Sequence, residues 1–337
     1  MGDTAYVRFD PLFGADEAEA MLRLCERFGR YGTYAVETIA DDFGEGIAQR
    51  HDAAVNFART GGRFGRTEAG DRLIARTNYF REEYAYGATL AEGIEPFLHF
   101  AGFHAAACQV MKCTVVEPNI VYANILVPGQ ELAVHTDVPE FRGMSRRTDP
   151  QWLLVAMHHS GLFDAWRMPI ATGVAWFGNP KGGEFVFYPD GASGSPVATP
   201  AVHNTAILLD TDSVFHGVDR VTEQKGDMPA LRPGMALEFA GSDAWTLEDG
   251  DRTVARYTWD DLRFSISWKA YCYPDPEAHR IAREHTDDLT RERAVDLLVS
   301  DLQARGRIQD RPDDTLLGLT IIDEYIQFPA AATEAPG

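Results

Sequence analysis

The sequence predicts an α+β protein whose core is a two-sheet barrel or jelly roll of antiparallel strands flanked by helices. Between residues 114 and 273, about seven or eight short segments rich in β-branched and aromatic residues are separated by Gly- and Pro-containing turns. Before and after this stretch, apolar residues recur at helical spacing. With 337 residues, of which 45% are hydrophobic, the chain is long enough for one large integrated domain.

The N-terminal region, residues 1–113, is predicted to be mostly helical and to pack on the core. Apolar residues within 18–28 lie at helical spacing, and Gly29 is suited to end that helix. Residues 40–90 show weak periodicity, which predicts loops with short helices. The apolar residues of 94–112 predict one helix that packs on the face of a sheet.

The core, residues 114–273, begins with a strand that a turn at Pro128-Gly129 ends. The next strand carries His135. Further strands are predicted at 152–157, 173–177, 181–191, 205–209, 214–216 and 263–271. The charged segment 222–260 is predicted to be an insertion between the last two core strands and a candidate lid over the site.

The C-terminal region, residues 274–328, is predicted to return to helices. Asp275 can cap the first of them and Pro276 can take its first position. Apolar stripes in the following sequence predict two more helices. The tail, residues 329–337, is predicted to be disordered because it is rich in Ala and Pro and has few large apolar residues.

The charge of the chain bears on its partners and location. It has 31 basic and 51 acidic residues and a net charge of −20, which argues against nucleic acid or an anionic membrane as a general partner. No apolar run approaches the length of a membrane span, and the N-terminus does not have the pattern of a signal peptide. The four cysteines are expected to be reduced, which predicts a cytoplasmic protein. The sequence leaves the oligomeric state open.

The segment Glu131-Leu-Ala-Val-His135-Thr-Asp137 is the strongest functional signal. On a strand, His135 and Asp137 would point to one face, about 6–7 Å apart along the chain. Such a pair can chelate a metal ion if a third ligand joins it, and His216, after a strand and a tight turn, is the candidate. Two imidazoles and one carboxylate on one face of an octahedral ion leave three positions open, which suits a metal ion that must bind further ligands.

These residues resemble a known family, the iron(II)- and 2-oxoglutarate-dependent oxygenases, nearest to the prolyl-hydroxylase-like branch. The resemblance covers residues 120–273. It rests on Gly129 six residues before His135, the triplet His135-Thr-Asp137, the segment Gly182-Gly183-Glu-Phe-Val-Phe-Tyr-Pro, His216, and Arg263-Phe-Ser265. It implies a double-stranded β-helix core, Fe(II) held by His135, Asp137 and His216, and 2-oxoglutarate and O₂ as co-substrates. It also implies succinate and CO₂ as co-products of the hydroxylation of an unactivated C–H bond.

The resemblance further implies residues that bind 2-oxoglutarate. Arg263 is the candidate for the distal carboxylate, because a guanidinium matches a carboxylate with two parallel hydrogen bonds. Ser265 would add a hydroxyl, and Asn124, or else Tyr122, would reach the co-substrate from the strand before His135. The family often places this arginine about ten residues after the distal histidine. Arg220 is nearer to that spacing, but only Arg263 has the alternating flanks of a final barrel strand.

The predicted substrate is a small molecule, such as an amino-acid-like compound or a secondary metabolite. Three arginines that follow the metal-binding segment, Arg142, Arg146 and Arg147, are candidates to meet an anionic group on it. One alternative is a hydroxylase of the same chemistry that acts on a protein or peptide residue. Another is a metal-binding β-barrel without oxidative chemistry, either a hydrolase or isomerase or a sensor. The motif Arg263-x-Ser265 favours the oxygenases, since the last class has no need to bind 2-oxoglutarate.

Overall fold

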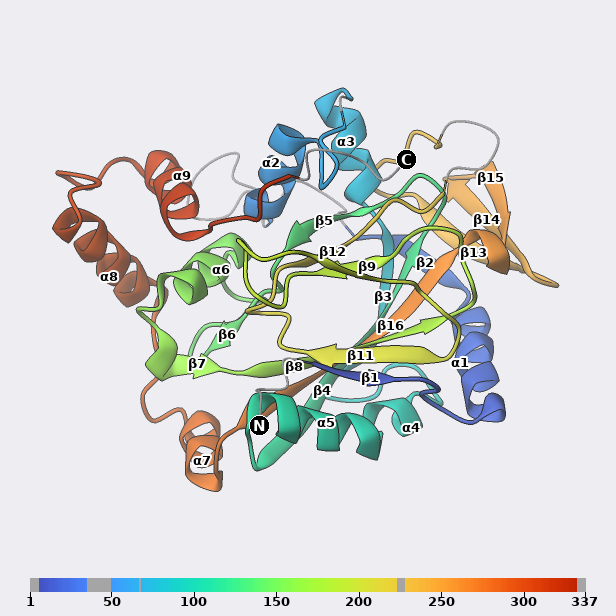
Figure 1. The fold of residues 1–337 in the computed structure, drawn as a ribbon, viewed down its shortest axis with the longest axis horizontal. Helices are drawn as coiled ribbons and strands as arrows, with labels where there is room; N and C mark the ends of the chain where they lie inside the picture. Colours follow the sequence, from blue (N-terminus) through green and yellow to red (C-terminus); the bar gives the residue numbers. More distant parts are fainter. Residues whose placement is uncertain (1–5, 35–49, 67, 223–227, 332–337) are drawn as a thin grey trace.

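Two antiparallel sheets form the centre of the molecule (Figure 1). The computed structural model describes residues 6–34, 50–66, 68–222 and 228–331. Of the tail predicted to be disordered, residues 332–337 lie outside this range. In spatial order, the major sheet contains β1 (Tyr6–Phe9), β11 (Thr205–Leu209), β8 (Ile170–Phe177), β16 (Arg263–Tyr273), β4 (Val115–Leu126), β3 (Phe80–Tyr86), β2 (Arg30–Thr33), β13 (Ala236–Gly241), β14 (Ala244–Asp249) and β15 (Arg252–Thr258).

The minor sheet is shorter, and its four strands alternate along the chain with those of the major sheet. In spatial order they are β10 (Val197–Thr199), β9 (Phe185–Phe187), β12 (His216–Val218) and β5 (Leu132–His135). The chain passes from β4 to β5, from β8 to β9, and from β11 to β12, so it crosses repeatedly from the major sheet to the minor one. This winding confirms the predicted double-stranded β-helix.

Strand β16 shows how the sequence separates the core from the site. Its apolar residues, among them Phe264 and Trp268, are buried in the largest hydrophobic cluster. There the Trp268 ring packs on Phe103 of α5, with ring centroids 5.4 Å apart. The alternate residues Arg263, Ser265, Ser267 and Lys269 are polar and also buried. Because successive side chains of a strand point to opposite faces, these four share the face that turns away from that core.

Helices cover the outer faces and the ends of the sheets (Figure 1). They are α1 (Ala15–Phe28), α2 (His51–Thr60), α3 (Gly70–Thr77), α4 (Glu95–Leu98), α5 (Ala101–Met111), α6 (Gln151–Ser160), α7 (Pro276–Glu284), α8 (Arg291–Ala304) and α9 (Asp314–Tyr325). The short pair β6 (Glu140–Phe141) and β7 (Arg167–Met168) and the single-turn helices Asp164–Trp166 and Trp259–Asp261 complete the described elements. None of the helices in the described ranges is long and apolar enough to cross a membrane.

Several predicted helix ends are confirmed. Helix α1 ends before Gly29, which is left-handed with φ of 78°. Helix α7 begins with Pro276, and the Asp275 side chain accepts a hydrogen bond from the Ala278 amide. The two further C-terminal helices are α8 and α9. With α6 they bury a second apolar cluster at one end of the barrel.

Two predictions about the N-terminal region were wrong. The region is not mainly helical, because β1, β2 and β3 join the major sheet. Strand β3 has three charged residues among seven, so its sequence does not look like that of a buried strand. The single helix expected at 94–112 is two helices, α4 and α5, because the backbone of Phe100 between them is extended (φ −62°, ψ 115°).

The strand predicted at 152–157 was also wrong, since these residues lie in helix α6. All six side chains are buried, so the segment has no polar face from which the helical period could be recognised. The insertion 222–260 does lie between the last two core strands. Its described strands, β13 to β15, extend the major sheet through β2 rather than covering the site as a lid. Residues 223–227 lie outside the described ranges.

Candidate metal centre

The two predicted imidazole ligands are cross-strand partners in the minor sheet. His135 is the last residue of β5 and faces His216, the first residue of β12, with ring centroids 4.4 Å apart. The register of β5 and β12 shifts between this pair and the next, which indicates a β-bulge. Gly217 is required there, because an added Cβ would lie 2.8 Å from the Leu132 carbonyl oxygen.

Asp137 completes the triad, although it lies just beyond β5 and not on it as predicted. Its Oδ1 is 3.6 Å from Nε2 of His135 and 3.8 Å from Nε2 of His216. One candidate ligand atom from each residue lies within 4.8 Å of the other two. The structure therefore brings the three predicted ligands around one point.

Each imidazole is oriented by a backbone carbonyl. Nδ1 of His135 is 2.7 Å from the Ala133 oxygen, and Nδ1 of His216 is 2.9 Å from the Val214 oxygen. A carbonyl oxygen only accepts, so each Nδ1 carries the proton and each Nε2 presents its lone pair to the centre of the triad. Burial, together with the neighbouring His135, lowers the pKa of His216 to about 3, so this imidazole is neutral at pH 7.

The short segment that joins His135 to Asp137 is held by three contacts. Arg50, which is paired with Asp52, donates from Nη2 to the Thr136 carbonyl oxygen at 3.0 Å. The Thr136 hydroxyl lies 3.2 Å from Nε2 of His159. The Asp137 amide donates to the Thr211 carbonyl oxygen at 2.8 Å. These contacts fix the ligand geometry before any metal binds, which is what a preorganised site requires.

Lys269 of β16 reaches the triad from the major sheet. Its Nζ lies 2.7 Å from Oδ2 of Asp137 and 2.9 Å from Oγ1 of Thr172. Burial acts to raise the pKa of Asp137, but Lys269 and the two imidazoles outweigh it and hold this pKa well below its usual range. Asp137 is therefore a carboxylate at neutral pH, with one oxygen held by Lys269 and the other facing the histidines.

Arg263 lies in the same space between the sheets. Its Nε donates to the Gly183 carbonyl oxygen at 2.6 Å, just before β9. Phe185, two residues further on, has its ring 5.6 Å from that of His216. The guanidinium is 2% exposed, and its Nη2 has no hydrogen-bond partner among the described residues. Burial lowers the pKa of Arg263 to about 9, and a buried cation in this state is stabilised by an anion that binds to it.

The other predicted co-substrate residues lie on β16 itself and on the neighbouring strand β4. Ser265 is 3.4 Å from Nη1 of Arg263 and is the register partner of Asn124 on β4. Oδ1 of Asn124 is buried and has no hydrogen-bond partner within the part of the chain that the structure describes. Tyr122 is the register partner of Ser267 and lies beneath the guanidinium of Arg81, whose Cζ is 3.7 Å from the ring centroid. All of these side chains are on the site face of the major sheet.

Arg220, the alternative to Arg263, is engaged elsewhere. Its Nε donates to Oε1 of Glu131 at 2.8 Å, and its Nη1 lies 3.2 Å from Oε1 of Glu68. The same two acids face Arg76, which pairs with Glu68 at 2.6 Å. Arg220 is thus part of a network that ties the β5 segment to α3.

Each of the three arginines predicted to meet the substrate already has a carboxylate partner. Arg142 binds Asp287 at 2.7 Å, and Arg147 lies 3.3 Å from Glu83. Arg146 binds Glu140 at 2.9 Å and donates to the Val138 carbonyl oxygen. Arg142 faces the C-terminal region. Arg146 is near the triad, because the charge of Asp137 is among the causes that raise its pKa. A contact with substrate stays a prediction for these residues.

Two residues of the site, Lys269 and Arg81, were missed by the sequence reasoning. The alternation of β16 contained the signal for Lys269, because it places this lysine on the same face as Arg263. The sequence around Arg81 has no comparable signal, since the predicted organisation of this region was loops and short helices. Pairing of β3 with β4 puts Arg81 opposite Asn124 and so into the site.

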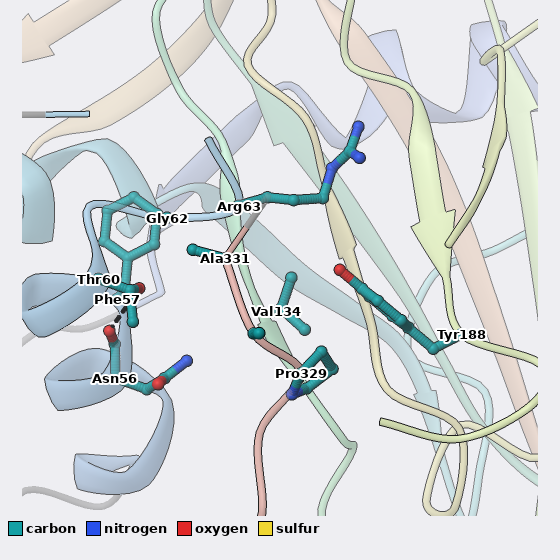
Figure 2. A pocket seen from close by; sticks show the side chains of 10 residues that line it. Asn56, Phe57, Thr60, Gly62, Arg63, Val134, Tyr188, Pro329 and Ala331 are labelled. Atoms are coloured by element: carbon teal, nitrogen blue, oxygen red, sulfur yellow. Dashed lines mark hydrogen bonds between the residues drawn. The ribbon is translucent and has the colours of Figure 1, made fainter. Parts of the chain in front are cut away.

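A separate hollow lies on the outer face of the minor sheet (Figure 2). Residues from α2, β5 and the chain after α9 line it. Val134 faces it, and Arg63 and Tyr188 extend toward one another across it (Figure 2). Arg63 is already paired with Asp219 at 2.5 Å. The lining residues include no imidazole or carboxylate, so this hollow offers no metal ligands.

Models of known protein families and curated protein sequences do not match this chain. The chain is similar to a solved oxidoreductase of the 2OG-Fe(II) oxygenase family from Burkholderia pseudomallei. The two are 12% identical, with a TM-score of 0.42 over 81% of this chain and 89% of that one.

Two other solved structures show the same degree of similarity. A prolyl hydroxylase from Trichoplax adhaerens, in complex with a hypoxia inducible factor peptide fragment, is 9% identical. Its TM-score is 0.43 over 82% of this chain and 86% of that one. HygX from Streptomyces hygroscopicus, with nickel, 2-oxoglutarate and hygromycin B bound, is 11% identical. Its TM-score is 0.39 over 80% of this chain and 84% of that one.

Proposed function

We propose that this protein is an Fe(II)- and 2-oxoglutarate-dependent dioxygenase that hydroxylates a C–H bond of a small molecule. The observation that carries the proposal is the presence of two buried features in the space between the two sheets. One is the buried triad of His135, Asp137 and His216. The other is the buried guanidinium of Arg263, whose Nη2 lacks a partner among the described residues. A metal site alone fits many functions, but a metal site beside an unpaired cation fits a metal-binding dicarboxylate.

The donor atoms fit iron. Two neutral imidazoles and one carboxylate form the facial set that non-haem iron oxygenases use, with open positions opposite the protein ligands. A structural zinc site usually has four protein ligands, and magnesium or calcium prefers oxygen donors alone. His135, Asp137 and His216 would hold the ion. When bound, iron activates dioxygen at the expense of 2-oxoglutarate, which gives succinate and CO₂ and oxidises the substrate.

The remaining residues would bind and orient the co-substrate. Arg263 pairs with the distal carboxylate, and Ser265 adds a hydroxyl hydrogen bond to it. Asn124 donates from its amide on the adjacent strand, which leaves Tyr122 to line the cavity. Gly183 supports Arg263 through its carbonyl oxygen. Enclosure between the two sheets excludes water from the bound diacid, and this strengthens each charge-assisted hydrogen bond.

The size of the substrate and the location of the protein follow from two further observations. His135 and His216 are 7% and 5% exposed, so the ligands lie within the barrel, and this supports a small molecule over a protein segment. The four cysteines, Cys25, Cys108, Cys113 and Cys272, are free thiols, which supports a reducing, cytoplasmic environment.

Anaerobic addition of Fe(II) and 2-oxoglutarate tests the proposal. We expect the weak visible charge-transfer band of a chelated 2-oxoglutarate, and we expect EDTA to remove it. Admission of oxygen should then release succinate slowly even without substrate. His135→Ala and His216→Ala should abolish both signals in folded protein. A folded wild type that binds metal but gives neither signal would instead identify a metal-binding barrel without oxidative chemistry.

A further inference from the structure

The cations around the triad differ in whether they have an acidic partner. Most of them form an ion pair with a described carboxylate: Arg50 with Asp52, Arg146 with Glu140, Arg147 with Glu83, Arg220 with Glu131, and Lys269 with Asp137. Two arginines of the site face have no such pair among the described residues, namely Arg263 and Arg81. The chain has 51 acidic residues and 31 basic ones, so two arginines on one face of the major sheet without a described acidic partner need an explanation.

Arg81 is held in place by aromatic rings. Its guanidinium carbon lies 3.7 Å from the ring centroid of Tyr122 and 5.3 Å from that of Tyr34. Tyr34 in turn stacks on Tyr79, with ring centroids 5.1 Å apart and an interplanar angle of 7°. Cation–π contacts stabilise the charge but satisfy none of the guanidinium hydrogen bonds along the edge. Tyr79 also forms a side-chain hydrogen bond with Arg81. The aromatic residues thus orient the guanidinium, and its other hydrogen-bond donors have no carboxylate partner among the described residues.

The position of Arg81 in the sheet separates it from Arg263. Arg81 is opposite Asn124 on β4, and Asn124 is opposite Ser265 on β16. Arg81 is therefore two strands away from the strand that carries Arg263, on the same face. Neighbouring strands are about 4.8 Å apart, so the two backbones are separated by about 10 Å across the sheet. One dicarboxylate chelated to the metal and bound to Arg263 leaves Arg81 for a second anion.

We propose that Arg81 binds a carboxylate of the primary substrate. This inference rests on the proposed function and deepens it, because it assigns the substrate to the class of small carboxylic acids. A planar carboxylate matches the free edge of a guanidinium with two parallel hydrogen bonds. The tyrosines beside Arg81 offer flat apolar surfaces to the rest of such a molecule. Arg81 would orient the substrate against the metal from the major sheet.

The test uses benzoate as the carboxylate probe and benzamide as its uncharged match. Anaerobic protein loaded with Fe(II) and 2-oxoglutarate is titrated with each compound by calorimetry. We expect benzoate to bind the wild type at least tenfold more tightly than benzamide does. Arg81→Gln should remove this preference. Arg81→Lys keeps the positive charge but cannot form two parallel hydrogen bonds, so it should retain part of the preference. Arg305→Gln is the matched control, since Arg305 also lies over a tyrosine ring, that of Tyr325 in the C-terminal region, but is paired with Glu324.

Other outcomes would overturn the inference. These are a wild type without preference for benzoate, equal preference in Arg81→Gln, or loss of preference in Arg305→Gln alone. The dissociation constant of 2-oxoglutarate is also measured for Arg81→Gln and Arg263→Gln. If Arg81→Gln raises it as much as Arg263→Gln does, Arg81 binds the co-substrate instead. Absence of the charge-transfer band in the wild type would reject the proposed function separately. To test Arg81 independently of the proposed function, the benzoate titration is repeated without metal on two proteins, Arg263→Gln and the double variant Arg263→Gln with Arg81→Gln. Equal benzoate affinities of these two proteins would also reject the role of Arg81.

Discussion

Lys269 Nζ lies 2.7 Å from Oδ2 of Asp137, while Oδ1 of the same carboxylate faces both imidazoles of the triad. The lysine is 1% exposed and comes from the opposite sheet. It joins the two sheets at the metal centre and directs one oxygen of Asp137 to the point where the metal would bind. Contacts of this kind around metal ligands orient them and tune their affinity.

Replacement of Lys269 by Met should weaken Fe(II) binding by about 10–100-fold, because Asp137 loses the partner that orients it. It should also destabilise the metal-free protein by about 3 kcal/mol, since a buried carboxylate is left without its cation. Competition with a metal-binding dye and urea denaturation measure the two effects. Ser267→Ala, on the same face of β16, is the control. Wild-type metal affinity in folded Lys269→Met would show that the lysine has only a packing role.

Arg263→Gln should raise the KM for 2-oxoglutarate by about 10–100-fold, because a charge-assisted bidentate contact is lost. Arg220→Gln is the matched variant, since Arg220 is bound to Glu131 and Glu68 instead. We expect it to lower stability and leave this KM unchanged. Succinate release over a range of 2-oxoglutarate concentrations separates the two. A raised KM in Arg220→Gln with a normal one in Arg263→Gln would transfer the co-substrate role to Arg220.

Gly183→Ala should raise the same KM by about tenfold through Arg263. An added Cβ would lie 2.7 Å from Cδ of Arg263, so the guanidinium must move. The backbone φ of Gly183 is +72°, which is strained for alanine in any surroundings. Gly191→Ala controls for this strain, because Gly191 has φ of +79° and no atom within 4 Å of an added Cβ. Equal KM values in the two variants would remove the steric explanation.

Asp212→Asn should make stability less dependent on pH between about pH 4 and pH 7. Asp212 is fully buried, neither carboxylate oxygen has a hydrogen-bond partner among the described residues, and burial raises its pKa to about 7. The folded state therefore keeps a proton that the unfolded state loses near pH 4, so the wild type loses stability as the pH rises through this window.

The asparagine variant lacks this loss, so its stability relative to the wild type should improve by on the order of 2–4 kcal/mol between pH 4 and pH 8. Urea denaturation of the metal-free proteins at the two pH values measures the difference. A difference that is independent of pH would mean that Asp212 is already ionised at pH 4, held by Arg167, whose Nη2 lies 3.9 Å away.

The sequence by itself predicted the barrel class, the three candidate metal ligands and the preference for Arg263 over Arg220. These follow from local patterns, because strand alternation assigns side chains to faces and residue chemistry limits what those faces can bind. Helix ends such as Gly29 and Asp275 were also predictable, since a single residue type satisfies each cap. The helix at 151–160 was not, because complete burial removes the polar residues that mark a helical period.

Only the tertiary structure decided which charges are neutralised. Arg142, Arg146, Arg147 and Arg220 have acidic partners that are distant in the chain or unremarkable in the sequence, so their availability could not be read from local patterns. Arg81 enters the site because β3 pairs with β4, and Lys269 reaches Asp137 because the two sheets face one another. Long-range pairing depends on the packing of whole elements, and so the groups that surround the metal ligands are set by the fold and not by any one segment.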